Sequence, residues 1–309
     1  MDKTHKHSDY LTILNDKGLR RLIWALMVNV LLTVVQVIGG VISGSLALIA
    51  DALHNFSDAI SLLIALIARK WAKKPADKKR TFGYKRAELI GAMINLTTLI
   101  LLGIYLLFEA ILRSFEPEPI AGWIVVIIAS VALVIDVVTA ALTYALAKDS
   151  LNIRAAFLHN VADALSSVAV IIAGTLIILY EWYFVDTLCT FLIAGYVLYY
   201  GYIEIQSVIR ILMQSVPVNI DIIDVTMRLE EIENVQQVHH LHVWELDEHT
   251  RSLEAHVVIS KADHEAIGKV KGQIKEVLNR SFQITHSTIE FESESEHDVC
   301  TYKSVITPH

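Results

Sequence analysis

Six long apolar stretches occupy most of the chain up to residue 212, and they limit the folds that are open to it. Each is close to or above the roughly 20 residues that a helix needs to cross a bilayer. They lie at 20–42, 45–69, 87–112, 121–147, 152–180 and 184–212. With 54% hydrophobic residues among 309, the chain is too apolar for an ordinary soluble enzyme. We predict an α-helical membrane protein with six transmembrane helices in residues 19–213, after a polar cytoplasmic tail at 1–18.

Lysine and arginine set the orientation of these stretches. The segment 69–86 is strongly basic and holds a single acid, Asp77. Its basic residues are Arg69, Lys70, Lys73, Lys74, Lys78, Lys79, Arg80, Lys85 and Arg86. Connections expected on the opposite side carry acids instead, namely Glu116, Glu118, Glu181 and Asp186. The positive-inside rule therefore places both termini in the cytoplasm and the basic segment against the lipid headgroups.

A short motif occurs twice, once in the second stretch and once in the fifth. His54 and Asp58 are four residues apart, as are His159 and Asp163, so each pair shares one helix face. At about 1.5 Å per residue, all four side chains reach the middle of the bilayer. An odd number of spans between the copies makes them run in opposite directions, as in transporters with inverted repeats.

Two imidazoles and two carboxylates form a suitable set for one tetrahedral zinc ion. The two carboxylates balance the charge of the ion, which matters because unbalanced charge inside a bilayer is costly. Without the metal, the same groups take up protons. Metal and protons thus compete for His54, Asp58, His159 and Asp163, and we predict exchange of divalent metal for protons.

Other interpretations of the motif residues are weaker. Hydrogen bonding between helices could account for one such pair, but two pairs with equal spacing at equal depth favour a metal site. An intramembrane metalloprotease would need an H-E-x-x-H helix, which the sequence lacks, so we predict no enzyme activity. Asp51 lies one turn from His54 and either assists the metal pathway or sits in interfacial water. Asp136, in the fourth stretch, either belongs to the pathway or bonds a neighbouring helix.

Residues 214–292 have the patterns of a separate soluble α+β domain. The periodicity predicts a helix at 218–232, strands at 237–246 and 251–260, a helix at 263–282 and a strand at 284–291. This αββαβ order favours a small open sheet with helices on one face. Strict alternation along the first strand would put His240 and His242 on one face and His239 on the other. Residues 293–309 are acidic and polar, and we expect them to be disordered.

Several segments resemble the cation diffusion facilitator family. These are SGSLALIADALHNFSD at 43–58, RTFGYKRAE at 80–88, LNIRAAFLHNVAD at 151–163, VHHLHVW at 238–244 and HSTIEFE at 286–292. The likeness covers about residues 20–292 and is greatest to bacterial exporters of zinc, cadmium and cobalt. It implies a homodimeric, proton-coupled exporter in the bacterial inner membrane, whose transport site is the repeated motif. Chiefly Zn²⁺ would be carried, with Cd²⁺ or Co²⁺ as alternatives.

The resemblance also implies a ferredoxin-like cytoplasmic domain that dimerises and binds metal. Its ligands would fall at His239, His256 and Glu292, with His242 and His286 as further candidates. Zinc would then be both the substrate and a regulatory ligand. Some relatives bind zinc through histidines in the second cytoplasmic loop, but 71–86 contains none, so we predict no site there.

Function classes other than transport find little support. A membrane metal sensor without net transport remains the alternative, although no kinase or nucleotide-binding motif accompanies it. Nothing in the sequence indicates an organic cofactor or a nucleic-acid partner. The two cysteines, Cys189 and Cys300, do not suffice for a disulfide framework or a thiolate cluster.

Overall fold

The computed structural model describes residues 16–72, 74, 76–144, 151–247, 250–260, 264–293 and 304–305. Most of the predicted N-terminal tail, and all but a few residues of the predicted disordered tail, lie outside these ranges. The chain divides into two compact units. One comprises residues 1–67 and 94–205, and the other comprises 68–93 and 206–309.

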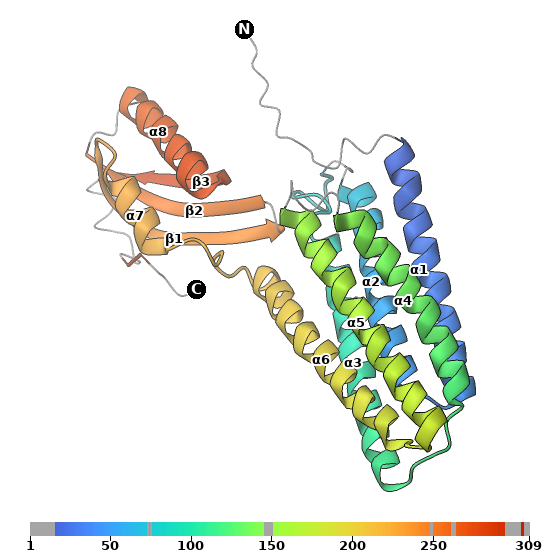
Figure 1. The fold of residues 1–309 in the computed structure, drawn as a ribbon. Coiled ribbons are helices and arrows are strands. Elements are labelled where there is room, and N and C mark those ends of the chain that lie inside the picture. The colour runs from blue at the N-terminus through green and yellow to red at the C-terminus, as the bar shows by residue number, and fades with distance from the viewer. Residues whose placement is uncertain are drawn as a thin grey trace. The chain divides into compact units, whose positions relative to one another are not determined.

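Six long helices account for the apolar part of the described chain, and in Figure 1 they run roughly alongside one another. They are α1 (Asp16–Ser43), α2 (Leu46–Ala72), α3 (Ala87–Phe115), α4 (Gly122–Tyr144), α5 (Leu151–Tyr180) and α6 (Phe184–Leu212). Each coincides with a predicted stretch to within a few residues. Within the described residues, segments of α3, α4, α5 and α6 are long and apolar enough to cross a membrane, and α1 contributes a shorter apolar helix at Met27–Ser43. Large apolar side chains such as Leu31, Val41 and Leu192 point outward and are more than half exposed.

The start of α2 is fixed by a residue from a distant part of the sequence. Gly44 ends α1 with a φ of +76°, a conformation that glycine adopts without strain. Asp186, at the start of α6, accepts hydrogen bonds from Ser45 Oγ (2.5 Å), Leu46 N (2.9 Å) and Ala47 N (3.3 Å). Its carboxylate therefore satisfies backbone N–H groups of the first turn of α2, as an N-cap would.

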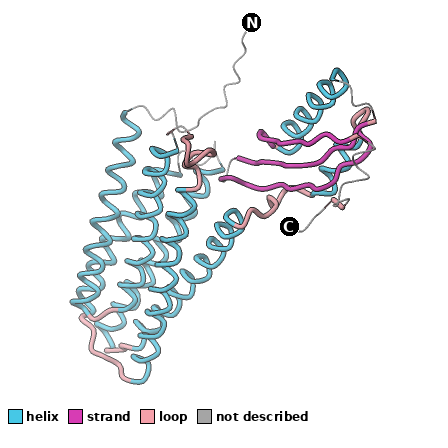
Figure 2. The backbone as a smooth tube through the Cα atoms, turned by 180° about the vertical axis from the view of Figure 1, so that it is seen from behind, coloured by secondary structure: helices cyan, strands magenta, loops and turns pink. Residues whose placement is uncertain are grey.

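The second unit contains a three-stranded sheet and two further helices, drawn as strands and helices in Figure 2. Its elements are α7 (Ile222–Glu230), β1 (Val235–Asp247), β2 (Thr250–Ile259), α8 (His264–Phe282) and β3 (Ile284–Glu292). The order helix–strand–strand–helix–strand agrees with the prediction. The strands are arranged β1-β2-β3, with β1 antiparallel and β3 parallel to β2.

One face of this sheet forms the core with α7 and α8. Leu253, Ala255 and Val257 of β2 are fully or almost fully buried and belong to the same apolar cluster as the inward residues of both helices. Helix α7 is shorter than predicted, because Asp221 caps it by accepting a hydrogen bond from Ile223 N at 2.9 Å. Residues 218–221 therefore precede the helix.

Strand β1 does not alternate regularly, which corrects the predicted faces of its histidines. The pairing with β2 shifts register between His239 and His242, and His240 has a φ of +49°. The backbone N–H groups of His240 and Leu241 donate to Ser304 O and Val305 O instead, at 3.0 and 2.9 Å. A residue with left-handed backbone at a bulge re-aims its side chain, so the period of two fails here.

Asp77, the only acid of the loop before α3, accepts three hydrogen bonds within that loop. The donors are Tyr84 Oη (2.8 Å), Lys79 N (2.7 Å) and Arg80 N (2.8 Å). The bond from Tyr84 contributes most to lowering the pKa of the Asp77 carboxyl, and the two backbone bonds add to it. All three stabilise the charged form.

Candidate functional site

Three of the four motif residues meet between α2 and α5. His54 Nε2 lies 3.0 Å from Asp163 Oδ1 and 3.8 Å from Asp58 Oδ2. One ligand atom from each of the three lies within 4.8 Å of the others, a spacing that allows all three to contact one ion. Asp163 is only 8% exposed, whereas His54 and Asp58 are partly buried.

The fourth motif residue, His159, is on α5 one turn before Asp163. Its side chain lies outside the described residues, so its position as a ligand stays a prediction.

Asp51 is tied to two neighbouring helices. Gln36 Nε2 of α1 donates to Asp51 Oδ2 at 2.7 Å, and Ser166 Oγ of α5 donates to Asp51 Oδ1 at 2.5 Å. The side chain of Asn55 donates to Gln36 Oε1 at 3.0 Å, which extends the network along α2. Because Asp51 is 2% exposed, it does not sit in interfacial water, and that interpretation was wrong.

Asp136 makes the inter-helix bond that the sequence offered as one alternative. Ser167 Oγ of α5 donates to Asp136 Oδ2 of α4 at 3.0 Å. A cavity of about 300 Å³ beside the site is lined by His54, Ser166 and Tyr196 among others. The rings of His54 and Tyr196 meet edge to face, 5.9 Å between centroids. Sequence reasoning missed Tyr196, because an aromatic residue in an apolar helix carries no signal of its own.

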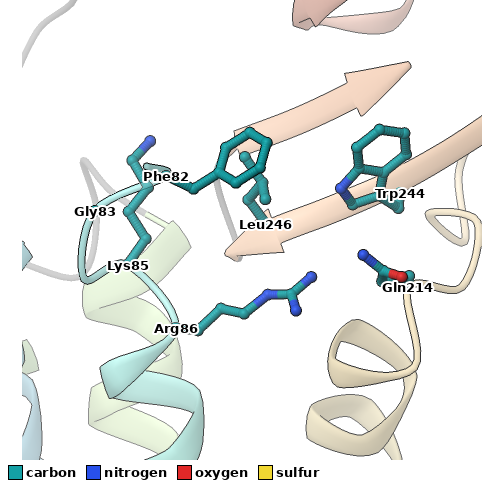
Figure 3. A pocket seen from close by; sticks show the side chains of 7 residues that line it. All are labelled: Phe82, Gly83, Lys85, Arg86, Gln214, Trp244 and Leu246. Atoms are coloured by element: carbon teal, nitrogen blue, oxygen red, sulfur yellow. The ribbon is translucent and has the colours of Figure 1, made fainter. Parts of the chain in front are cut away.

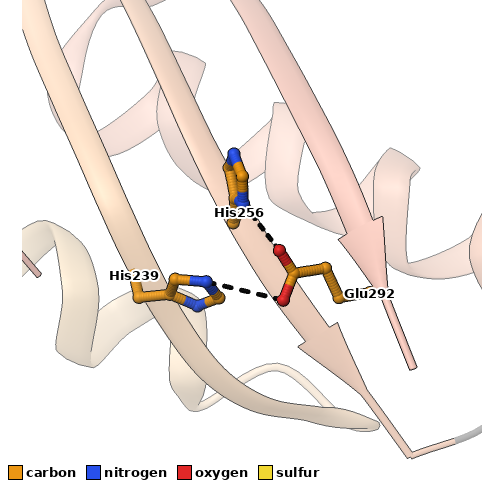
Figure 4. Close-up of side chains that lie close together, drawn as sticks. All are labelled: His239, His256 and Glu292. Atoms are coloured by element: carbon orange, nitrogen blue, oxygen red, sulfur yellow. Dashed lines mark hydrogen bonds and ion pairs between the residues drawn. The ribbon is translucent and has the colours of Figure 1, made fainter. Parts of the chain in front are cut away.

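A second cluster lies on the sheet and joins all three strands (Figure 4). His256 Nδ1 is 2.6 Å from Glu292 Oε1, and His239 Nε2 is 3.5 Å from Glu292 Oε2. Paired positions on neighbouring strands share a face. His239 opposes His256, and Val257, the next residue of β2, points into the helix-covered core. The cluster is therefore on the face opposite α7 and α8.

Of the remaining histidines named from the sequence, neither joins this cluster. The ring of His242 meets that of His240 edge to face, 5.1 Å between centroids. His286 is exposed and meets the ring of Phe82 edge to face at 6.0 Å. His240, which was not proposed as a ligand, lies close to His256, 4.7 Å between ring centroids. Only the bulge brings it there, so regular strand geometry could not have predicted the contact.

These features define a class of protein: a multi-pass membrane protein that carries a histidine–carboxylate cluster between helices and another on a small sheet domain. Histidine with carboxylate is a ligand set for zinc and related divalent ions. The family comparison agrees. Residues 22–213 match the cation efflux transmembrane domain and residues 217–294 match the cation efflux protein cytoplasmic domain, so the chain belongs to the cation efflux family.

Named relatives are similar over most of their length. A cadmium, cobalt and zinc/H(+)-K(+) antiporter of Bacillus subtilis is 37% identical over 270 residues, 86% of either chain. The metal cation efflux system protein CzcD of Cupriavidus metallidurans is 38% identical and covers 84% of this chain and 82% of its own. The zinc transporter ZitB of Escherichia coli is 35% identical over 95% of this chain and 94% of its own. A solved metal-bound C-terminal domain of a CzcD transporter is 34% identical over 24% of this chain and 99% of its own, with a TM-score of 0.22.

Proposed function

We propose that this protein exports divalent metal from the bacterial cytoplasm in exchange for protons, chiefly Zn²⁺, with Cd²⁺ or Co²⁺ as further substrates. Six helices in residues 19–213 would cross the inner membrane, with both termini in the cytoplasm. Residues 214–292 would form a ferredoxin-like cytoplasmic domain through which two copies dimerise. The family membership and the names of the relatives support export of these ions. The family description of the cytoplasmic domain supports its location.

The observation that carries the transport site is the meeting of His54, Asp58 and Asp163 from two helices. With His159 they give four ligands and a net charge of zero when a divalent ion is bound. Four protein ligands leave no open position for a catalytic water, which suits transport rather than hydrolysis.

Proton coupling follows from the same contacts. Without metal, the His54 imidazole lies within hydrogen-bonding distance of the Asp163 carboxylate, at 3.0 Å. A metal ion must displace any proton held between these two groups, because both atoms become ligands. Protons arriving from outside can therefore return the site to its metal-free form and release the ion.

The sheet cluster is the proposed second metal site. His239, His256 and Glu292 supply two imidazoles and one carboxylate, and His239 is wholly buried. Since all three strands contribute, bound zinc would stiffen the sheet of the cytoplasmic domain and so act as a regulatory ligand.

Zinc flux into inside-out proteoliposomes tests the proposal, with wild type compared with Asp163→Asn. The variant keeps the shape of the side chain but leaves one uncompensated positive charge on the loaded site, so we expect flux to fall at least about a hundredfold. Glu116→Gln is the control, because it removes a carboxylate from an exposed residue away from the site, and flux should persist. Unchanged flux in Asp163→Asn would refute the site. Flux that ignores an imposed pH gradient would refute proton coupling alone.

A further inference from the structure

A cavity of about 300 Å³ opens between the loop that precedes α3 and strand β1. Figure 3 shows side chains from three separate parts of the chain around it. Phe82, Lys85 and Arg86 come from the loop, Gln214 follows α6, and Trp244 and Leu246 come from β1. The cavity is distinct from both metal clusters, since no ligand of either lines it.

In the proposed orientation, the cavity would lie near the level of the lipid headgroups. Arg86 immediately precedes α3, and Gln214 is two residues beyond the end of α6. Both helices are long and apolar enough to cross a membrane, and these are their cytoplasmic ends in the orientation that the basic residues set. A ligand in the cavity would therefore contact polar headgroups on one side and water on the other.

The lining of the cavity carries two cationic side chains, Lys85 and Arg86. No carboxylate among the described residues forms an ion pair with Arg86, whose side chain extends toward Gln214 in Figure 3. Lys85, in contrast, is 3.7 Å from Asp247 and donates to Thr250 Oγ1 at 2.8 Å. The only acid of the loop, Asp77, is engaged by Tyr84 and by the backbone N–H groups of its own turn.

The walls of the cavity are apolar. Phe82, Trp244 and Leu246 present two aromatic rings and one aliphatic side chain beside the guanidinium. A second cavity of about 300 Å³ shares Gly83 and Arg86 and adds two further cations, Lys74 and Arg80. Arginine beside apolar walls suits an anion that carries an apolar substituent, because the fork of N–H groups binds phosphate oxygens and the rings cover carbon atoms. The positive lining excludes a metal cation.

We propose that this cavity binds the phosphate of an anionic phospholipid headgroup, with Arg86 as its main partner and Trp244 and Phe82 against the glycerol and upper acyl chain. Free phosphate shares the chemistry of the headgroup but lacks the part that would contact the aromatic rings. The lipid would then link the end of α3, the residue after α6 and the first strand of the cytoplasmic domain.

Lipid binding to the full-length protein in neutral detergent tests the proposal. Phosphatidylglycerol is titrated into the micelles, and two quantities are measured: lipid phosphate retained per chain and the midpoint of thermal unfolding. Arg86→Gln should weaken retention by at least about tenfold, as expected for loss of a charge-assisted hydrogen bond. Lys78→Gln is the matched control, because it removes one charge from the same loop at an exposed residue that lines neither cavity. It should bind as wild type does.

A second variant covers the case in which Arg86→Gln does not fold. Gln214→Glu has nearly the same shape but supplies a carboxylate that can occupy Arg86, so it too should weaken retention. Separate arms with inorganic phosphate and with phosphatidylcholine distinguish the source of the anion. A rise in unfolding midpoint with inorganic phosphate alone, lost in Arg86→Gln, would replace the lipid with a free anion and overturn the lipid assignment. Equal retention of phosphatidylglycerol by wild type, Arg86→Gln and Gln214→Glu would overturn the site itself.

Discussion

Replacing Asp186 with alanine should destabilise the helix that carries half of the transport site. The carboxylate is 1% exposed and receives the hydroxyl of Ser45 and the backbone N–H groups of Leu46 and Ala47. Loss of a helix cap costs about 1 kcal/mol, and each buried donor left without a partner costs about 1–3 kcal/mol. The Ser45 hydroxyl can rotate to another acceptor, and removal of a buried charge offsets part of the loss. We therefore expect a net loss of about 3 kcal/mol.

For a domain of this size, about 3 kcal/mol corresponds to a fall of roughly 6–12 °C in the unfolding midpoint. The assay is thermal unfolding of the purified full-length protein in detergent, followed by size-exclusion chromatography of the fraction that stays folded. Glu116→Ala removes the same charge from an exposed residue expected on the same side of the membrane and should change the midpoint little. A variant of Asp186 as stable as wild type would refute the idea that its carboxylate caps α2.

Three further predictions concern other parts of the chain. Gly122→Ala would place a Cβ 2.8 Å from a backbone carbonyl of α5 and should cost about 1–3 kcal/mol in thermal unfolding, whereas Gly195→Ala has open space and should be neutral. His256→Ala should reduce zinc bound by the full-length protein in equilibrium dialysis by one ion per chain, and His286→Ala should leave it unchanged; equal losses would contradict the proposed ligands. Asp77→Asn should speed trypsin cleavage in its loop several-fold at pH 7. Because its pKa is lowered, the contribution of the carboxylate to the loop is complete at neutral pH and is lost only as the pH falls through that lowered value.

The six long helices were predictable because their signals are local and repeated. An apolar stretch of sufficient length predicts a helix, and all six stretches are helices here. His54 and Asp58 are four residues apart on one of them, so helix geometry alone places both side chains on one face. The further step, that Asp163 comes from another helix to meet them, rested on matched depth, and the 3.0 Å contact with His54 agrees with it.

The capping role of Asp186 could not be predicted from local sequence patterns. This residue lies near the start of the predicted stretch 184–212, and its acidity indicated only which side of the membrane that end faces. Its contacts are to residues about 140 positions earlier in the chain. No periodicity or capping motif near Asp186 points to α2, so only the packed structure could identify the cap.

The sheet cluster includes side chains that regular strand geometry places correctly and one that it does not. His256 and Glu292 lie on neighbouring strands whose pairing is regular at these positions, so simple alternation puts both on the face opposite the helices. His239 reaches the same face as alternation requires, but the next residue does not follow the rule, because its backbone is left-handed and its N–H pairs with Ser304. The irregular residue, His240, is consequently the histidine that lies closest to the ring of His256. A rule based on the period of an element holds for a side chain only while its backbone keeps that period. In β1 that period is lost at His240, whose backbone N–H donates to Ser304, a residue far away in the sequence.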